Sequence, residues 1–119
     1  MNFKLKLGYR FFCYFFLLFL IIFISFSPTS LAANLDEGTK VFQTYCAGCH
    51  AHGGNIIRRG KSLKKRALKR NGYESIADVS QIVTQGKGNM SAYADRLTPE
   101  EIDIVSRYVW QQAEQGWKQ

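Results

Sequence analysis

An all-α fold of about four helices is the fold class that this 119-residue sequence predicts. Apolar residues recur every three or four positions in several separate stretches, which is the spacing of helices with one buried face. No stretch alternates apolar and polar residues for the length of a useful strand. A motif of two cysteines and a histidine between the first two helical stretches implies that the helices enclose a bound group. The helical stretches are residues 34–45, 62–71, 75–85 and 98–116.

The motif Cys46-Ala47-Gly48-Cys49-His50 is typical of the covalent attachment site of a c-type haem. Two cysteines with two residues between them can form thioethers with the two vinyl groups of one haem, and the adjacent histidine then lies below the iron. We therefore expect one covalent haem c, bound through Cys46 and Cys49, with His50 as an axial ligand of its iron. Such a haem must supply much of the core of the domain.

Two other kinds of site use similar residues. A thioredoxin-like Cys-x-x-Cys redox pair usually follows a strand in an alternating pattern of strands and helices, which this sequence lacks. A zinc site would use His52 as its fourth ligand, but all four ligands would then fall within seven consecutive residues, too tight for wrapping a tetrahedral ion. Neither alternative requires a histidine directly after the second cysteine.

The first 32 residues have the order of a secretory signal peptide. A positive start precedes an aromatic and aliphatic run over residues 11–26, and the small residues of Ser30-Leu31-Ala32 follow. Cleavage after Ala32 would remove Cys13 and leave one domain over residues 33–119. An uncleaved anchor is the alternative, although sixteen apolar residues are short for a span of about twenty. The positive residues are Lys4, Lys6 and Arg10.

The domain that remains after cleavage has 87 residues, enough for one small domain with a thin core. The chain holds 16 Lys and Arg against 9 Asp and Glu, and three of the cations lie in the signal, so the domain carries thirteen minus nine, or plus four. Only Cys46 and Cys49 remain, so no thiol is left for a disulfide once the haem is attached. Export argues against nucleic acid as a partner, and we expect no stable membrane insertion after cleavage.

The helix predicted over residues 34–45 leads the chain into the haem motif. Its apolar face consists of Leu35, Gly38, Phe42 and Tyr45. A glycine on such a face usually marks the close approach of another helix. Either Asn34 or Asp36 could cap the start of this helix.

Paired glycines in the loop after the motif indicate a tight turn beside the haem. His52 lies too close to His50 to reach the opposite face of the ring, so we expect it to be a solvated loop residue and not an iron ligand. Asn55 is either a hydrogen-bonding residue near the haem or a plain turn residue. The sequence leaves both roles of Asn55 open.

Eight of the thirteen cations of the domain are concentrated in one basic block. They are Arg58, Arg59, Lys61, Lys64, Lys65, Arg66, Lys69 and Arg70. Ser62 could cap a short helix here whose apolar side includes Leu63, Ala67 and Leu68, and Asn71-Gly72 would end it. The block is either a docking face for an acidic partner or a merely solvated helix surface.

The third helical stretch ends at Gly86 and leads to the second expected iron ligand. Gly86 and Gly88 let the backbone lie close to a flat ring, and Met90 is the only methionine outside the predicted signal. A thioether sulfur is a standard axial ligand in electron-carrying haem proteins, although a lone methionine more often fills a gap in a core. We expect Met90 to coordinate the iron. The apolar side of the stretch is Ile76, Val79, Ile82 and Val83.

The last helix has the clearest boundaries. Thr98 as N-cap, Pro99 at the first helical position and Glu101 three residues after the cap form a capping box, and Gly116 ends the helix. The predicted buried face consists of Ile102, Val105, Tyr108, Val109 and Ala113.

The ordered set of motifs resembles the class I cytochromes c, and among them the cytochrome c6 family. The resemblance implies a small class I fold of about four helices wrapped around one covalent haem, with His50 and Met90 as axial ligands and the first and last helices crossing at Gly38, Phe42 and Tyr108. It also implies a soluble, monomeric one-electron carrier without catalytic residues, which shuttles electrons from cytochrome f of the b6f complex to photosystem I in the thylakoid lumen, or works in a periplasm. The motifs are Gly38-x-x-x-Phe42, Cys46-Ala47-Gly48-Cys49-His50, Ser62-Leu63-Lys64-Lys65, Gly86-Lys87-Gly88-x-Met90, Thr98-Pro99-Glu100-Glu101-Ile102, Tyr108-Val109 and Gly116-Trp117.

Three positions depart from the usual pattern of that family. Met90-Ser91-Ala92-Tyr93 replaces the common Met-Pro-Ala-Phe, and Ile82 stands where typical members carry a glutamine and offshoots carry an aliphatic residue. An apolar group beside the ring changes its electrostatics, so the chain could be an offshoot with a different potential and partner. Two other functions stay open. They are a gas-binding or peroxidatic haem protein, and a cytochrome carrier or subunit serving an exported respiratory oxidase or dehydrogenase.

Overall fold

The structure is a computed structural model that describes residues 12–19 and 29–118. The chain divides into two units, Met1–Ser30 and Leu31–Gln119, and each is considered separately here. Within the first unit, residues 12–19 form a helix whose aromatic side chains are exposed. The expected positive start of the signal at Lys4, Lys6 and Arg10 lies outside the described residues, so cleavage after Ala32 stays a prediction. No helix among the described residues combines the length and apolarity that a membrane span needs.

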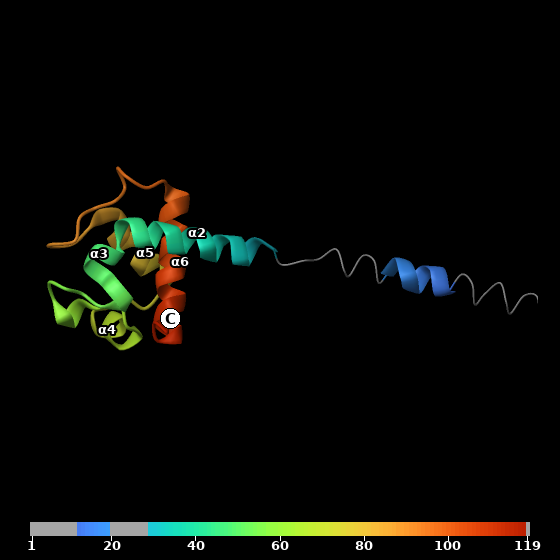
Figure 1. The fold of residues 1–119 in the computed structure, drawn as a ribbon, viewed down its shortest axis with the longest axis horizontal. Helices are drawn as coiled ribbons and strands as arrows, with labels where there is room; N and C mark the ends of the chain where they lie inside the picture. The colour runs from blue at the N-terminus through green and yellow to red at the C-terminus, as the bar shows by residue number, and fades with distance from the viewer. Residues whose placement is uncertain (1–11, 20–28, 119) are drawn as a thin grey trace, which may run out of the picture. The chain divides into compact units, whose positions relative to one another are not determined.

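The second unit is built from helices (Figure 1). The α-helices are α2 Thr29–Tyr45, α3 Ala47–His50, α4 Lys65–Arg70, α5 Ile76–Gln85 and α6 Pro99–Gln115, with short 3-10 turns at Ala51–Gly53 and Arg59–Lys61. Among the described residues, extended pairing is limited to one isolated bridge between Lys87 and Met90. The predicted all-α class is confirmed, and α3 is a short helix that the apolar spacing did not reveal.

The start of α2 differs from the prediction. The helix begins at Thr29, so neither Asn34 nor Asp36 caps it. Leu31-Ala32-Ala33 are strong helix formers, and no proline interrupts the chain between Thr29 and Tyr45. The Asp36 carboxylate instead forms an ion pair of 2.7 Å with the Lys40 ammonium one turn later, on the exposed side of the helix.

The expected cap at Ser62 is also wrong. Helix α4 begins at Lys65, with Lys64 in the N-cap position and no side-chain cap. Ser62 is extended because the next residue is tied elsewhere: the Leu63 N–H donates to the Gly53 carbonyl at 2.8 Å. The loop after the haem motif therefore decides where α4 can start.

The boundaries of the other two helices follow the prediction. The Ser75 hydroxyl caps α5 by accepting from the Asp78 N–H, and Gly86 ends the helix with a φ of 69°. Both hydrogen bonds of the capping box between Thr98 and Glu101 are present at the start of α6. Local chemistry of this kind can be read directly from the sequence.

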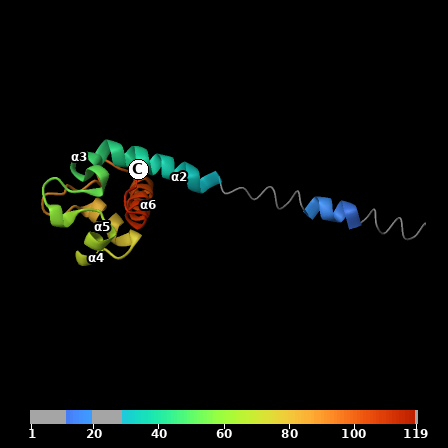
Figure 2. The same cartoon turned by 60° about the horizontal axis from the view of Figure 1, so that its bottom comes forward.

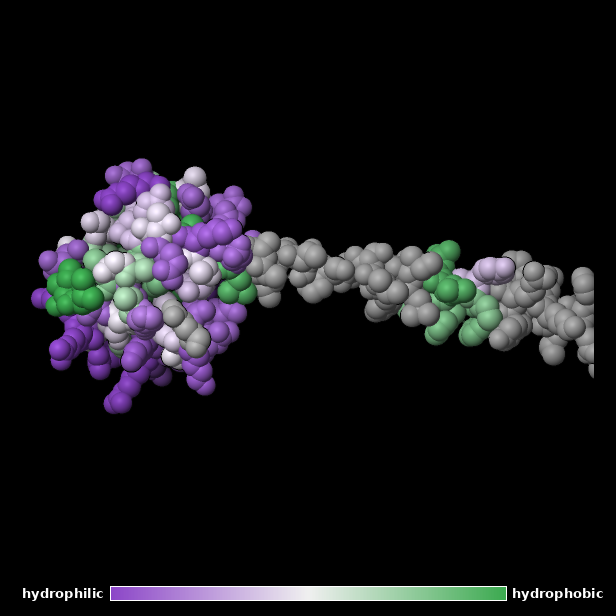
Figure 3. Space-filling model, in the orientation of Figure 1, coloured by the Kyte–Doolittle hydropathy of each residue, from purple (hydrophilic) through white to green (hydrophobic). Residues whose placement is uncertain are grey.

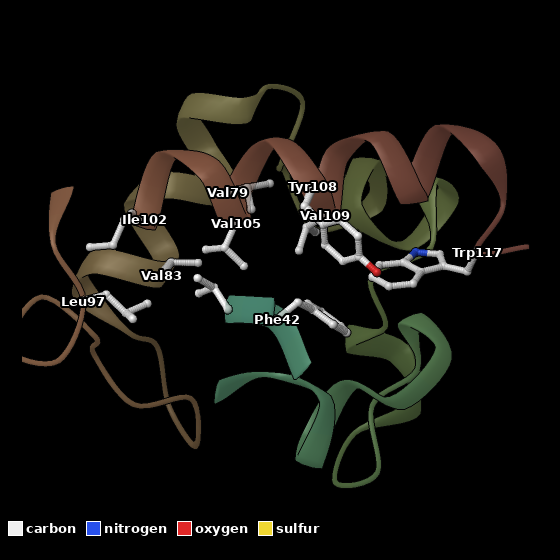
Figure 4. Packing of buried hydrophobic residues seen from close by; sticks show 10 residues of the cluster. Phe42, Val79, Val83, Leu97, Ile102, Val105, Tyr108, Val109 and Trp117 are labelled. Carbon is white, nitrogen blue, oxygen red and sulfur yellow. The ribbon is translucent and has the colours of Figure 1, made fainter. Parts of the chain in front are cut away.

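Helices α2 and α6 cross and form the centre of the core (Figures 1 and 2). The crossing is close because Gly38 has no side chain: a Cβ there would lie 2.8 Å from the Cβ of Tyr108 and 3.1 Å from the Ile104 carbonyl oxygen. Phe42 is 2% exposed and its ring centroid lies 5.3 Å from that of Tyr108 and 5.2 Å from that of Trp117 (Figure 4). All five residues predicted for the inner face of α6 are buried.

Candidate haem site

A cavity of about 290 Å³ opens beside the core of the second unit. The haem motif lines it together with residues from α5, α6 and the Met90 loop, and apolar side chains make up most of its wall. Folding thus brings Cys46, Cys49, His50 and Met90 to one cavity, although Met90 is far from the motif in the chain. The deep apolar part of the wall includes Phe42, Leu68, Val79, Val83, Val105 and Val109.

The imidazole of His50 is held in one orientation by the loop that follows it. Its Nδ1 atom lies 2.9 Å from the Gly54 carbonyl oxygen, and a carbonyl can only accept, so Nδ1 carries the proton. The lone pair is then on Nε2, in a ring that is 8% exposed and lines the cavity. A metal-ligating histidine usually donates its other N–H in this way. The geometry of His50 fits an axial ligand of haem iron.

Gly53 and Trp117 pack together and hold the loop that orients His50. Gly53 has a φ of 70°, and a Cβ there would lie 2.4 Å from the Trp117 ring, so only glycine fits. The Trp117 indole N–H donates to the Leu63 carbonyl at 3.1 Å, although Trp117 itself has a positive φ of 56°. Trp117 does not line the cavity itself but holds the loop that orients His50. Apolar spacing did not identify it, and the sequence pointed to it only through the family resemblance.

The two cysteines differ in exposure. Cys46 is partly buried and Cys49 is exposed, so the motif runs from the wall of the cavity to its rim. Burial raises the pKa of the Cys46 thiol to about 11, and the nearby Cys49 thiol makes a smaller contribution to this rise. A redox-active Cys-x-x-Cys pair needs a lowered pKa at its accessible attacking thiol, so the raised pKa of the partly buried Cys46 does not decide this alternative. Within the described residues no strand precedes the motif, and a thioredoxin-like pair usually follows one.

The zinc alternative fails on geometry. His52 is exposed, has a positive φ of 51° and is not part of the cavity wall, as expected for a solvated loop residue. Among the residues that the structure describes, no three His, Cys, Asp or Glu side chains form a group that could hold a metal ion. The side chains that line the cavity fit a c-type haem: two thiols for covalent attachment, one imidazole and one thioether.

Met90 lies in a tight loop after α5. Its N–H and carbonyl pair with the Lys87 carbonyl and N–H at 3.1 and 2.9 Å. Gly86 makes this turn possible, since a Cβ there would lie 2.6 Å from both the Met90 carbonyl oxygen and the Ala92 nitrogen. The half-buried Met90 side chain lines the same cavity as His50.

The open question about Asn55 is answered by its hydrogen bonds. Its Oδ1 accepts from the Ile57 and Arg58 N–H groups at 3.0 and 2.7 Å, and its Nδ2 donates to the Lys61 carbonyl at 3.2 Å. Asn55 therefore organises the turn at the rim of the cavity. Ile82 also lines the cavity, so an apolar side chain stands at the position that the sequence singled out.

Known proteins resemble this chain over most of its length. A family profile described as "Cytochrome C oxidase, cbb3-type, subunit III" matches residues 33–109. A protein of Nostoc sp. (strain PCC 7120) named "Cytochrome c6-like" is 49% identical over 100 residues, which cover 84% of this chain and 90% of that protein. Cytochrome c6 of Thermostichus vulcanus is 46% identical over 96 residues, 81% of this chain and 86% of that one.

Solved structures agree with these relatives. Cytochrome c6C from Synechococcus sp. PCC 7002 superposes with a TM-score of 0.65 at 58% sequence identity, over 66% of this chain and 96% of that one. Fold, donor set and relatives define the class: the chain belongs to the class I c-type cytochromes. Within that class it is similar to cytochrome c6 and its variants. It carries one covalent haem c with its iron, and it is an electron carrier and not an enzyme.

Proposed function

We propose that Cys46 and Cys49 form the thioethers, that His50 Nε2 and the Met90 sulfur are the axial iron ligands, and that the chain passes single electrons from cytochrome f to photosystem I. The compartment would be the thylakoid lumen or a periplasm, reached through the predicted signal. The carrying observation is that His50 and Met90 line one cavity, with the imidazole already oriented by Gly54. Relatives named cytochrome c6 support the photosynthetic assignment.

The side chains around the cavity have distinct tasks in this proposal. The bound haem supplies a one-electron couple between ferric and ferrous iron. Two protein ligands leave no open coordination position, which suits a carrier and disfavours gas binding or peroxidase chemistry. The apolar wall excludes water and so limits the change in solvation when the charge of the site changes by one.

The basic block reaches the rim of the same cavity. All eight of its side chains are exposed, and two of them, Arg58 and Lys61, line the cavity. Among the described residues, one acidic side chain neutralises a cation of the block: the Glu114 carboxylate forms an ion pair with the Lys65 ammonium. Figure 3 shows strongly hydrophilic side chains over the lower part of the second unit, where α4 lies in Figure 1. This distribution favours the docking interpretation over the solvated-surface one.

Two exposed isoleucines form a small apolar surface beside the basic block. Ile56 and Ile57 are 72% and 58% exposed, and the Ile56 N–H donates to the Cys49 carbonyl at 3.1 Å, so this pair borders the second thioether position. A transient complex needs only a small interface, below about 1,200 Å² of total buried surface. We propose that the partner covers this rim while the basic block speeds the encounter.

The function is tested with the haem-loaded protein and its two suggested partners. Reduced cytochrome f should reduce the ferric protein, and illuminated photosystem I should oxidise the ferrous protein, each in a second-order reaction that slows as salt rises. A matched control is a typical cytochrome c6 under the same conditions. Fast reduction by cytochrome f without oxidation by photosystem I would identify an offshoot with another acceptor and would refute the shuttle.

A second candidate function rests on the family profile, whose description names an oxidase subunit. In that case the chain would remain attached to an exported oxidase. Purification from native membranes at low salt distinguishes the two: a carrier elutes alone, and a subunit co-purifies with haem proteins of the oxidase.

A further inference from the structure

The loop that presents Met90 lacks the proline common in the related family, and carries Ser91 instead. Ser91 is exposed, and within the described part of the chain the backbone of Met90 pairs with Lys87 alone, inside the same turn. A turn closed only on itself does not fix where the Met90 sulfur lies relative to His50. The half-buried Met90 side chain packs against the hydrophobic core. A contact between this loop and the haem-motif side of the cavity adds to that positioning.

Tyr93 provides such a contact. Its N–H donates to the Val83 carbonyl in α5 at 3.0 Å, and its hydroxyl donates to the Tyr45 carbonyl at 3.0 Å. The Tyr45 and Tyr93 rings also meet edge to face with centroids 6.3 Å apart, and the Arg96 guanidinium lies 5.1 Å from the Tyr93 centroid. Tyr93 thus connects the Met90 loop to α5 on one side and to the end of α2 on the other.

The Tyr45 carbonyl, which accepts the hydrogen bond from the Tyr93 hydroxyl, lies at the end of α2. Tyr45 is the last residue of α2, and the last carbonyls of a helix have no partner inside the helix. The next residue is Cys46, the first thioether position. A phenylalanine at position 93 would keep the ring contact but leave the Tyr45 carbonyl to water.

We infer that the Tyr93 hydroxyl is a positioning group that ties the Met90 loop to the end of α2, beside Cys46, and keeps the Met90 sulfur at the iron in the absence of a proline in the loop. The inference rests on the proposed ligation by Met90. Tyr93 does not touch the iron itself. It acts by favouring the closed loop over an open one in which the sulfur has left.

The size of the effect follows from ordinary hydrogen-bond energetics. One hydrogen bond of usual net strength changes the ratio of closed to open loops by about two- to tenfold. An external ligand binds the iron only when the loop is open, so its apparent affinity changes by the same factor. Imidazole is a suitable probe, because it replaces methionine sulfur at ferric iron.

The experiment compares Tyr93→Phe with two further variants in the haem-loaded protein. Imidazole is titrated against the ferric form while the weak near-infrared sulfur-to-iron band is followed. Tyr93→Phe should bind imidazole about two- to tenfold more tightly than the unaltered protein. Tyr45→Phe is the matched control, because it removes a hydroxyl from the same ring pair and keeps the accepting carbonyl, so its affinity should be unchanged.

Ser91→Pro added to Tyr93→Phe should restore weak imidazole binding, because the rigid residue replaces the lost connection. Equal affinities of Tyr93→Phe and the unaltered protein would overturn the inference. So would equal gains in Tyr93→Phe and Tyr45→Phe, which would indicate general loosening of the ring pair. Absence of the sulfur band in the unaltered protein would refute Met90 ligation itself and this inference with it, while electron transfer to photosystem I would remain separately measurable.

Discussion

Gly38 of α2 lies directly against Tyr108 of α6, so closely that a Cβ on Gly38 would stand 2.8 Å from the Cβ of Tyr108. Real Cβ atoms do not approach other atoms to this distance. The same added Cβ would also lie 3.1 Å from the Ile104 carbonyl oxygen. The helix crossing also places the Phe42 ring against both Tyr108 and Trp117, whose rings contact each other as well, and Phe42 lines the cavity. The crossing therefore determines the back wall of the haem site.

Gly38→Ala should lower the free energy of unfolding by about 1 to 3 kcal/mol, because the added methyl group forces the two helices apart. Guanidinium unfolding of the haem-loaded protein, followed by helix circular dichroism, measures this change. Gly60→Ala is the control, since its Cβ would meet only the tip of Arg70 at 3.9 Å. The control should be neutral or slightly stabilising. Equal effects of both substitutions would mean that the crossing tolerates a larger separation.

Met90→Ala should abolish the sulfur-to-iron band of the ferric protein and leave the iron open to small ligands, because the thioether is the proposed sixth ligand. Absorption spectra with and without added cyanide are the measurement. Asn89→Ala is a neighbouring control that should keep the band. A Met90→Ala protein that retains the band would exclude Met90 as the ligand.

Ile82→Gln should raise the reduction potential. The Ile82 side chain lines the haem cavity, and a polar group in its place would alter the electrostatics and hydrogen bonding around the ring. A redox titration of both proteins gives the difference. Thr84→Val is a useful comparison on the same helix, since Thr84 does not line the cavity. An unchanged or lower potential in Ile82→Gln would show that this position does not tune the haem.

Lys64→Gln combined with Lys69→Gln should slow electron transfer to the acceptor at low salt. Steering raises association rates by about 10- to 1,000-fold, so losing two of eight cations should cost a few-fold. Salt at about 0.1 M screens charges beyond about 10 Å, and the difference should shrink there. Lys65 is left intact, because it is paired with Glu114.

The control for this pair is Lys40→Gln with Arg107→Gln, which changes the net charge by the same amount outside the basic block. Unlike Lys64 and Lys69, both control residues are paired with an aspartate on their own helix, so the control isolates the effect of net charge and not of an unpaired cation. Its transfer rate should stay close to that of the unaltered protein, and both double variants should keep the same spectrum. Equal slowing in the two double variants would indicate an effect of net charge alone. Slowing in neither would leave the Ile56 and Ile57 rim as the docking contact.

Local chemistry made much of this protein readable from its sequence. The capping box at Thr98 and Glu101, the stop at Gly86 and the buried face of α6 each depend on residues within one or two helical turns. The same holds for the haem motif, because both cysteines and the histidine fall within five consecutive residues. Gly38 was readable too, since a glycine on an apolar helical face usually marks the close approach of another helix.

Tertiary structure decided what depends on distant segments. Ser62 is no cap because Leu63 pairs with Gly53, and Lys65 is not free because Glu114 at the end of α6 pairs with it. The hydrogen bond from Tyr93 to Tyr45 joins residues separated by 48 positions. Spacing along a chain reports which face of a helix is buried, but not which partner the fold brings to a polar group at its end. The sequence by itself therefore predicted the four main helical stretches and the haem, and only the folded chain determined where α2 and α4 begin and which contacts hold the loops of His50 and Met90 in place.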